Sequence, residues 1–187
     1  MLHIVYGGSA SGKSSYAESF AMSLQGEGRL LYIATMYPYK WNTTEIDPET
    51  MQRIERHRAM RADKGFDTVE CYRHVEHIVA KRQDVLLLEC MSNLLANEMY
   101  LEPDSNAGSD MAETMSPVSN KIVQALIDLS TRVQELVIVT NDVFSDGGSL
   151  TYDESTREYV KNLAEINCAL AVSYTHLRAH ETLRHLV

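Results

Sequence analysis

Eight residues near the start of the chain, GGSASGKS at 7–14, have the types and spacing of a phosphate-binding loop. They fit the pattern G-x-x-x-x-G-K-[ST] and lie between a predicted strand and a predicted helix, which favours this reading over a chance glycine-rich turn. Backbone N–H groups of such a loop converge on one anion, and the helix N-terminus adds its positive dipole end. The residues that we expect to bind a nucleoside triphosphate here are Gly7, Gly8, Ser9, Ala10, Ser11, Gly12, Lys13 and Ser14.

Two members of this loop have predicted chemical roles. Lys13 is expected to act catalytically by reaching the β- and γ-phosphates, and the Ser14 hydroxyl is expected to bind Mg²⁺. A second Mg²⁺ ligand is expected at the end of a neighbouring strand, where Glu89 closes the apolar run DVLLLE. The alternative for Glu89 is a surface charge at a strand end.

A second stretch, RIERHRAMR at 53–61, places four arginines around one histidine. On a helix, His57 would stack with Arg53 and Arg61, one turn away on either side. Neighbouring positive charge disfavours protonation of an imidazole, and a neutral imidazole is a nucleophile. Arginine also suits phosphate oxygens. The stretch therefore predicts one of two roles: His57 attacks an α-phosphate, or the histidine and arginines only bind a phosphate. The alternative is a solvated helix face without either role.

The elements that position these residues follow from hydrophobic patterning. Short runs that are apolar on both faces predict buried parallel strands at 2–6, 30–35, 84–89 and 136–140. Helical spacing predicts helices at 13–25, 49–61, 72–82 and 118–134. The alternation predicts an α/β fold of the P-loop NTPase, RecA-like type, with a mostly parallel sheet and helices on both faces.

Two segments depart from this alternation. Residues 97–120 mix acidic residues with Pro, Gly and Ser, and we expect a loop or irregular excursion there. Residues 173–187 hold three histidines and no apolar strand, and we interpret them as a non-native tail without a metal site. We therefore expect one nucleotide-binding domain at 1–172, and leave open whether its sheet lacks the last strand.

Bulk composition excludes several classes of protein. A net charge of −9 argues against a general nucleic-acid binder. The sequence contains no run of 18 apolar residues, so we expect no membrane span. The N-terminus has no basic leader, and the three widely spaced cysteines are expected to be reduced, buried thiols. These features predict a soluble cytoplasmic protein.

Six short segments, in order, resemble one known family. They are GGSASGKS, YIAT at 32–35, RIERHR at 53–58, TVEC at 68–71, LLLEC at 86–90 and IVTNDV at 138–143. The phosphate-binding loop is generic, but YIAT followed by R-I-x-x-H-R is far more particular. On these segments the chain resembles the bifunctional adenosylcobinamide kinase/adenosylcobinamide-phosphate guanylyltransferase family of cobalamin biosynthesis.

The resemblance implies two reactions that depend on Mg²⁺. A nucleoside triphosphate, GTP or ATP, phosphorylates adenosylcobinamide, and GMP from GTP then passes through a histidine to adenosylcobinamide phosphate. His57 matches the guanylylated histidine. Further nucleotide-binding positions carried over by the resemblance are Ala34, Thr35, Met36, Arg58, Ala59, Met60, Arg61, Glu70 and Glu89. The family also implies a homo-oligomer, commonly a trimer.

Two other functions stay open on the sequence. The chain could be a P-loop kinase of another small metabolite, in which His57 and its arginines only clamp phosphate. It could also be a nucleotide-dependent switch or assembly module without small-molecule turnover. Covalent labelling of the protein by GTP separates the first reading from guanylyl transfer.

Overall fold

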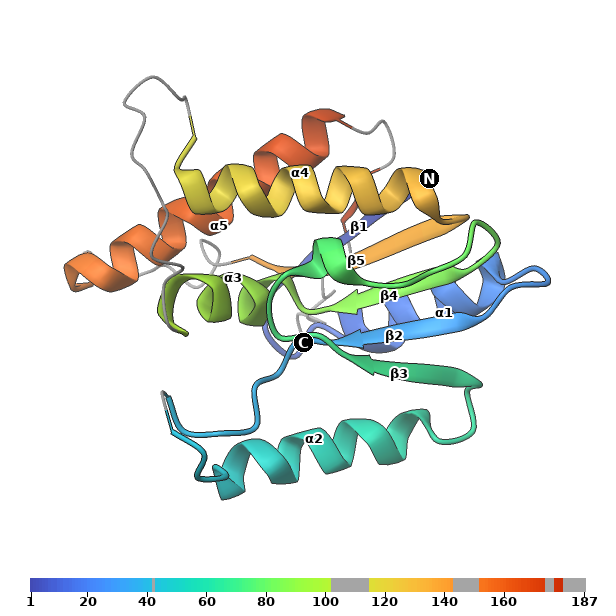
Figure 1. Ribbon diagram of the computed structural model, residues 1–187, viewed down its shortest axis with the longest axis horizontal. Helices are drawn as coiled ribbons and strands as arrows, with labels where there is room; N and C mark the ends of the chain where they lie inside the picture. Colours follow the sequence, from blue (N-terminus) through green and yellow to red (C-terminus); the bar gives the residue numbers. More distant parts are fainter. Residues whose placement is uncertain (42, 102–114, 143–151, 174–176, 180–187) are drawn as a thin grey trace, which may run out of the picture.

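A computed structural model describes residues 1–41, 43–101, 115–142, 152–173 and 177–179. Its centre is a six-stranded sheet in the order β3-β2-β4-β5-β1-β6 (Figure 1), and every described strand pair is parallel. The strands are β1 Leu2–Gly7, β2 Leu30–Ala34, β3 Phe66–Glu70, β4 Val85–Glu89, β5 Glu135–Asn141 and β6 Leu177–Ala179. The predicted α/β, RecA-like P-loop architecture is confirmed.

Helices cover both faces of the sheet. They are α1 Lys13–Leu24, α2 Pro48–Arg61, α3 Met91–Tyr100, α4 Pro117–Arg132 and α5 Glu154–Ser173, with a 3₁₀ turn, η1, at Val75–His77. Helix α1 packs on one face, whereas α3, α4 and α5 pack on the other. Helix α2 belongs to neither layer and lies beside β3 (Figure 1).

The central strands are apolar on both sides because both sides are covered. In β4, Leu86 and Leu88 join the core under α3, α4 and α5, whereas Val85 and Leu87 join the core under α1. Side chains alternate between faces along a strand, so a strand covered by two helix layers needs an uninterrupted apolar run. This requirement explains why β1, β2, β4 and β5 are recognisable from sequence.

The carboxyl ends of the strands form one edge, which positions the candidate site. In the register of the sheet, Gly7 lies opposite Asn141, and Ala34 lies between Glu70 and Glu89. Ligands of open parallel sheets bind at this edge. Segments far apart in sequence therefore supply neighbouring polar groups.

Two predicted elements differ in the structure. The predicted helix at 72–82 is wrong, since only η1 forms there, and its core contact is through Val75 and Ile78. Strand β3 was not predicted, because it is an edge strand whose residues Asp67, Thr68 and Glu70 are exposed. The loop expected at 97–120 begins later and ends earlier, because α3 extends to Tyr100 and α4 starts at Pro117; residues 102–114 lie outside the described part.

The C-terminal segment contributes a strand, contrary to expectation. Strand β6 pairs with the outer edge of β1, with Leu177 opposite Ile4. Strand pairing uses backbone N–H and C=O groups, so an edge strand can form without an apolar run. The sheet thus has a last strand, while the interpretation of 173–187 as a non-native tail and the domain boundary at 172 stay predictions.

Two further expectations concern the thiols and the membrane. All three cysteines are free, but Cys168 is exposed rather than buried, and Cys71 and Cys90 are half-buried. Among the helices that the structure describes, none has both the length and the apolar character that crossing a bilayer requires.

Asp84 links neighbouring segments at the end of the sheet opposite the candidate site. Its replacement tests how much this link stabilises the fold. The fully buried carboxylate accepts hydrogen bonds from the backbone N of Arg29 (3.0 Å), the Arg29 guanidinium (2.6 Å) and the backbone N of Lys81 (2.8 Å). We expect Asp84→Ala to lower the free energy of unfolding by about 2 to 4 kcal/mol, because it leaves buried donors unpaired. Urea titration measures this loss, and an unchanged midpoint would contradict it.

The same carboxylate predicts a pH dependence. Burial alone would raise the pKa of Asp84, but hydrogen bonds from Arg29 and from the backbone of Lys81 outweigh it and hold the pKa below its usual value. A lowered folded-state pKa stabilises the protein at neutral pH, and this stabilisation is lost as pH falls through that pKa. Asp84→Asn should therefore show a smaller loss of stability between neutral and acidic pH than the unmodified chain.

Candidate active site

The phosphate-binding loop joins β1 to α1 with backbone geometry that glycine favours. Gly12 has φ of 81° directly before α1, and no side chain caps the helix N-terminus. An uncapped N-terminus leaves its N–H groups available to an anion. The Lys13 ammonium donates to the carbonyl of Gly8 at 3.1 Å, so it lies over its own loop. The segment predicted to bind phosphate therefore forms a loop, and the Lys13 side chain folds back over that loop.

Helix α2 lies across from this loop and begins at a well-defined cap. Asp47 accepts from the backbone N of Thr50 at 3.3 Å, and Pro48 follows it at the first helical position. In α2, all of whose residues are described, Arg61 is the single buried side chain. Two ion pairs hold the helix or the turn after it: Arg58 with Glu70 of β3, and Lys64 with the buried Glu18 of α1.

A cavity of about 230 Å³ opens between the loop, α2 and the carboxyl edge of the sheet. It brings together residues that lie far apart in the sequence, from Ser9 to Asn141. The predicted site residues that line it are Ser9, Lys13, Ser14, Ala34, Met36, His57, Arg58, Arg61, Glu70 and Glu89. His57 is half-buried there, and Arg53 and Arg61 line the same cavity one turn to either side. Arg56 does not line it.

The other predicted residues lie outside this lining. Gly7, Gly8, Ala10, Ser11 and Gly12 form the backbone of the loop itself. Ala59 and Met60 are exposed on another side of α2.

Thr35 has a structural contact instead. It is fully buried, and its hydroxyl donates to the carbonyl of Cys90 at 2.9 Å and accepts from the backbone N of Cys90 at 2.7 Å. These two hydrogen bonds join the segments that follow β2 and β4. Thr35 therefore positions the two strand ends that line the cavity.

Arg61 is the most unusual group in the cavity. Its guanidinium carbon lies 3.4 Å from the centre of the Tyr32 ring, and the residue is only 6% exposed. Within the part of the chain that the structure describes, its Nε and Nη1 are buried and have no hydrogen-bond partner. Buried donors without acceptors cost free energy, and a cation–π contact offsets only part of that cost. The arrangement fits an anion that accepts from these two nitrogens.

Glu89 and Tyr32 form the floor of the cavity. The Tyr32 hydroxyl donates to Glu89 Oε2 at 3.2 Å. Burial raises the pKa of Tyr32, and the Glu89 carboxylate raises it further, so the phenol remains a donor. The hydroxyl of Ser14 and the carboxylate of Glu89 line one space, and oxygen ligands of this kind suit Mg²⁺.

Several lining residues were not predicted as site residues. They are Tyr32, Ile54, Thr68, Tyr72, Cys90, Asn93, Val139 and Asn141. Asn141 ends β5 at the edge where ligands bind, and that position could have indicated it. Tyr72 donates to Glu70 at 2.9 Å, a contact that needs the fold.

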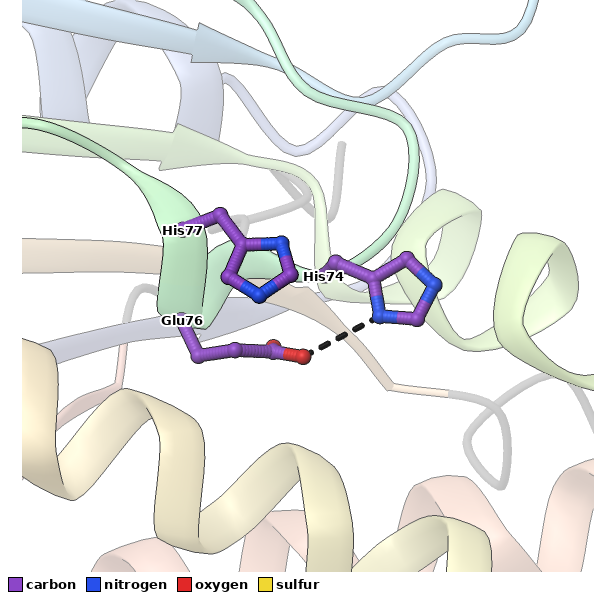
Figure 2. Close-up of side chains that lie close together, drawn as sticks. All are labelled: His74, Glu76 and His77. Carbon is purple, nitrogen blue, oxygen red and sulfur yellow. Dashed lines mark hydrogen bonds and ion pairs between the residues drawn. The ribbon is translucent and has the colours of Figure 1, made fainter. Parts of the chain in front are cut away.

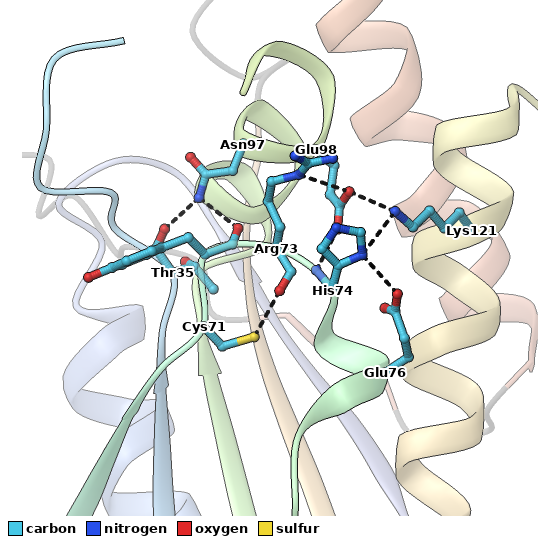
Figure 3. Close-up of polar contacts among 9 residues, drawn as sticks. Thr35, Cys71, Arg73, His74, Glu76, Asn97, Glu98 and Lys121 are labelled. Atoms are coloured by element: carbon cyan, nitrogen blue, oxygen red, sulfur yellow. Dashed lines mark hydrogen bonds and ion pairs between the residues drawn. The ribbon is translucent and has the colours of Figure 1, made fainter. Parts of the chain in front are cut away.

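A histidine cluster lies away from this cavity. The possible ligand atoms of His74, Glu76 and His77 all lie within 4.8 Å of one another, and His74 Nδ1 is 3.1 Å from Glu76 Oε1 (Figure 2). The Lys121 ammonium lies 3.4 Å from the same Nδ1 (Figure 3). A positive charge at that distance disfavours a bound cation.

The contacts around the cluster join three elements. Arg73 and Lys121 both reach Glu98 Oε2, at 3.5 and 3.0 Å, and Glu98 also accepts from the backbone N of His74 (Figure 3). The Asn97 amide donates to the carbonyl of Thr35 at 2.8 Å. The cluster therefore connects the segment before η1 to α3 and α4, and the Asn97 contact extends this network to the end of β2.

Comparison with known proteins identifies one family. A family model described as cobinamide kinase / cobinamide phosphate guanyltransferase matches residues 3–178. The match spans most of the chain and confirms the resemblance found on short segments. A comparison with curated proteins found no match.

Lys13→Ala tests the loop as the place of chemistry. We expect nucleotide-dependent transfer to fall on the order of 10²- to 10³-fold, because a lysine that neutralises developing phosphate charge is lost. The melting temperature should stay close to that of the unmodified chain, since the hydrogen bond that the described residues show for the Lys13 ammonium is to a carbonyl of its own loop. Lys161→Ala, at an exposed lysine of α5, is the matched control. Near-normal turnover in the Lys13 variant would contradict this role.

Arg61→Met separates binding from folding. Methionine keeps much of the volume, loses the contact with Tyr32 and removes two buried donors for which the described residues supply no acceptor. These effects oppose each other, so we expect the melting temperature without ligand to change by no more than about 3 °C. The rise in melting temperature caused by saturating GTP should be largely lost. Arg56→Met, at an exposed arginine of the same helix, should keep that rise. A strongly destabilised Arg61 variant with normal GTP affinity would contradict the prediction.

Proposed function

Because the chain belongs to the cobinamide kinase / cobinamide phosphate guanyltransferase family of cobalamin biosynthesis, we propose a two-step reaction on one scaffold. The protein phosphorylates the aminopropanol hydroxyl of adenosylcobinamide with GTP or ATP. It then transfers GMP from GTP to the resulting phosphate through a guanylyl group on His57.

One observation carries this proposal. His57, Lys13 and Ser14 line the same cavity, although they come from α2 and from the first turn of α1. A triphosphate held by the loop would therefore lie beside the imidazole. A solvated helix face would not place His57 opposite a phosphate-binding loop.

The charges around His57 support phosphate binding. Arg53, Arg58 and Arg61 line the cavity with it. Arg58 is paired with Glu70, whereas the buried Arg61 has two donors that fit phosphate oxygens. These groups would hold the α-phosphate and offset charge that develops on it.

The covalent route divides one displacement into two. A ring nitrogen of His57 attacks the α-phosphorus of GTP, an N–P bond forms, and the bond to the β-phosphate oxygen breaks with loss of pyrophosphate. A phosphate oxygen of adenosylcobinamide phosphate then attacks the same phosphorus, and the N–P bond breaks. His57 is regenerated, and the product is adenosyl-GDP-cobinamide.

In the kinase step, the substrate hydroxyl oxygen attacks the γ-phosphorus, the nucleoside diphosphate leaves, and the hydroxyl proton is released. Lys13 would stabilise the charge on the transferred group. Mg²⁺, held by Ser14 and Glu89, would neutralise the β- and γ-phosphates when bound. The trimeric assembly implied by the resemblance and the cytoplasmic location stay predictions.

His57→Asn tests the covalent step. Asparagine keeps a polar side chain of similar size but removes the nucleophile, so we expect no covalent label from α-labelled GTP and no guanylylated product. The label in the unmodified protein should be labile to acid and stable to base, as a phosphoramidate is. GTP should still raise the melting temperature of the variant, because the loop is intact.

His77→Asn is the matched control, since His77 is exposed and lies in the cluster away from the cavity. It should keep the label. A label that persists in His57→Asn, or that maps to His74 or His77, would contradict the assignment. Kinase activity without any covalent label in the unmodified protein would favour a plain P-loop kinase.

A further inference from the structure

A group of aromatic side chains gathers at the end of β2, in the segment that leads to α2. Tyr37 lies against Tyr39, with ring centres 5.4 Å apart, and against Trp41, with ring centres 6.5 Å apart. Trp41 is also 6.0 Å from Tyr100 of α3. Although large and apolar, Tyr39 and Trp41 are 38% and 51% exposed. We call residues 37–41 the aromatic loop.

The aromatic loop is held in place by its backbone. Tyr39 forms a bridge with Ile46, the backbone N of Asp47 donates to the carbonyl of Pro38 at 2.9 Å, and the Lys40 ammonium pairs with Glu45 at 2.6 Å. The exposed rings are therefore presented by an ordered turn, and they contribute little to the core. Exposed aromatic groups of this kind indicate a binding surface.

The rings border a second cavity, of about 290 Å³, which adjoins the first. Tyr37, Tyr39 and Trp41 line it, and three residues line both cavities: Met36, Arg53 and Asn93. A molecule resting on the aromatic loop would reach the nucleotide cavity past Arg53. The second cavity is thus placed for the molecule that receives phosphate and GMP.

We propose that this second cavity and the aromatic loop bind the corrin macrocycle of cobinamide. This inference rests on the proposed function and deepens it. A macrocycle with broad apolar faces suits stacking on Trp41 and Tyr39, and its carboxamide edge suits the amide of Asn93. The macrocycle is larger than the cavity, so it rests on the exposed rim and extends its aminopropanol arm toward His57.

Arg53 gives the junction between the cavities its charge. It lies one turn before His57 on α2 and lines both spaces. A guanidinium there suits the phosphate of cobinamide phosphate at the point where that phosphate must approach the guanylyl group. The same geometry orients the acceptor in both reactions.

Substitution of the rings tests this subsite. Trp41→Ala and Tyr39→Ala should each raise the KM for cobinamide, and its Kd by equilibrium dialysis, by roughly 10- to 100-fold. Trp41→Phe should recover most of the affinity. The amount of guanylyl label formed on His57 from GTP alone should not change in any variant, which also shows that each variant is folded. Tyr152→Ala, at an exposed aromatic residue that lines neither cavity, is the matched control.

A direct signal comes from Trp41, which is the single tryptophan of the chain. Corrinoids absorb in the range of tryptophan emission, so saturable quenching by cobinamide is expected in the unmodified protein. The same quenching curve should shift to higher concentration in Tyr39→Ala. Free N-acetyltryptophanamide corrects for absorption by the ligand.

The outcomes separate the two proposals. Cobinamide affinity and KM within twofold of the unmodified protein in both alanine variants would overturn the subsite and leave the proposed function standing. A change in oligomeric mass without a change in cobinamide affinity would overturn it in favour of a subunit interface. Unmodified protein that neither binds nor phosphorylates cobinamide would overturn the subsite and the proposed function together.

Discussion

The candidate site depends on how α2 is held against the sheet, and that contact is made by charge. Arg61 is the single buried side chain in this fully described helix, and it rests on the Tyr32 ring. The remaining ties are the Arg58–Glu70 and Lys64–Glu18 pairs. Exposed ion pairs contribute about 0 to 1 kcal/mol each, so the position of His57 relies mainly on the buried contacts of Arg61 and Glu18.

The cavity therefore has two unlike walls. The loop of residues 7–14 follows β1 and Glu89 ends β4, and the side chains of both strands are packed between helix layers. The wall formed by α2 has few apolar contacts and is the part most able to adjust. Elements with little buried apolar surface have low local stability, and nucleotide-binding enzymes use such elements to close over a substrate. A bound phosphate that accepts hydrogen bonds from the buried nitrogens of Arg61 would draw α2 towards the loop of residues 7–14 and the sheet.

The sequence predicts the rigid wall better than the adjustable one. Strands β1, β2, β4 and β5 are covered on both faces and are continuous apolar runs, and the loop after β1 has a fixed spacing. Strand β3 escaped prediction because an edge strand needs no such run, and β6 is likewise an edge strand, paired with β1. The RIERHRAMR pattern predicted that His57 lies in line with Arg53 and Arg61 on one face of a helix. The sequence could not show that Arg61 is buried on Tyr32, because that contact depends on how α2 lies against β2. Nor could it show that Thr35 bonds Cys90, because that contact depends on the pairing of β2 with β4.

Under the proposed function, both reactions would take place in one cavity, and this would have a kinetic consequence. Lys13, which would assist phosphoryl transfer, and His57, which would accept GMP, line the same cavity. One nucleotide would then have to leave before the next could react. GTP serving as phosphoryl donor would compete with GTP serving as guanylyl donor, and a guanylylated histidine would obstruct the kinase reaction until its GMP is discharged. The two proposed activities would then alternate in time, and the supply of phosphorylated acceptor would set the rate of turnover.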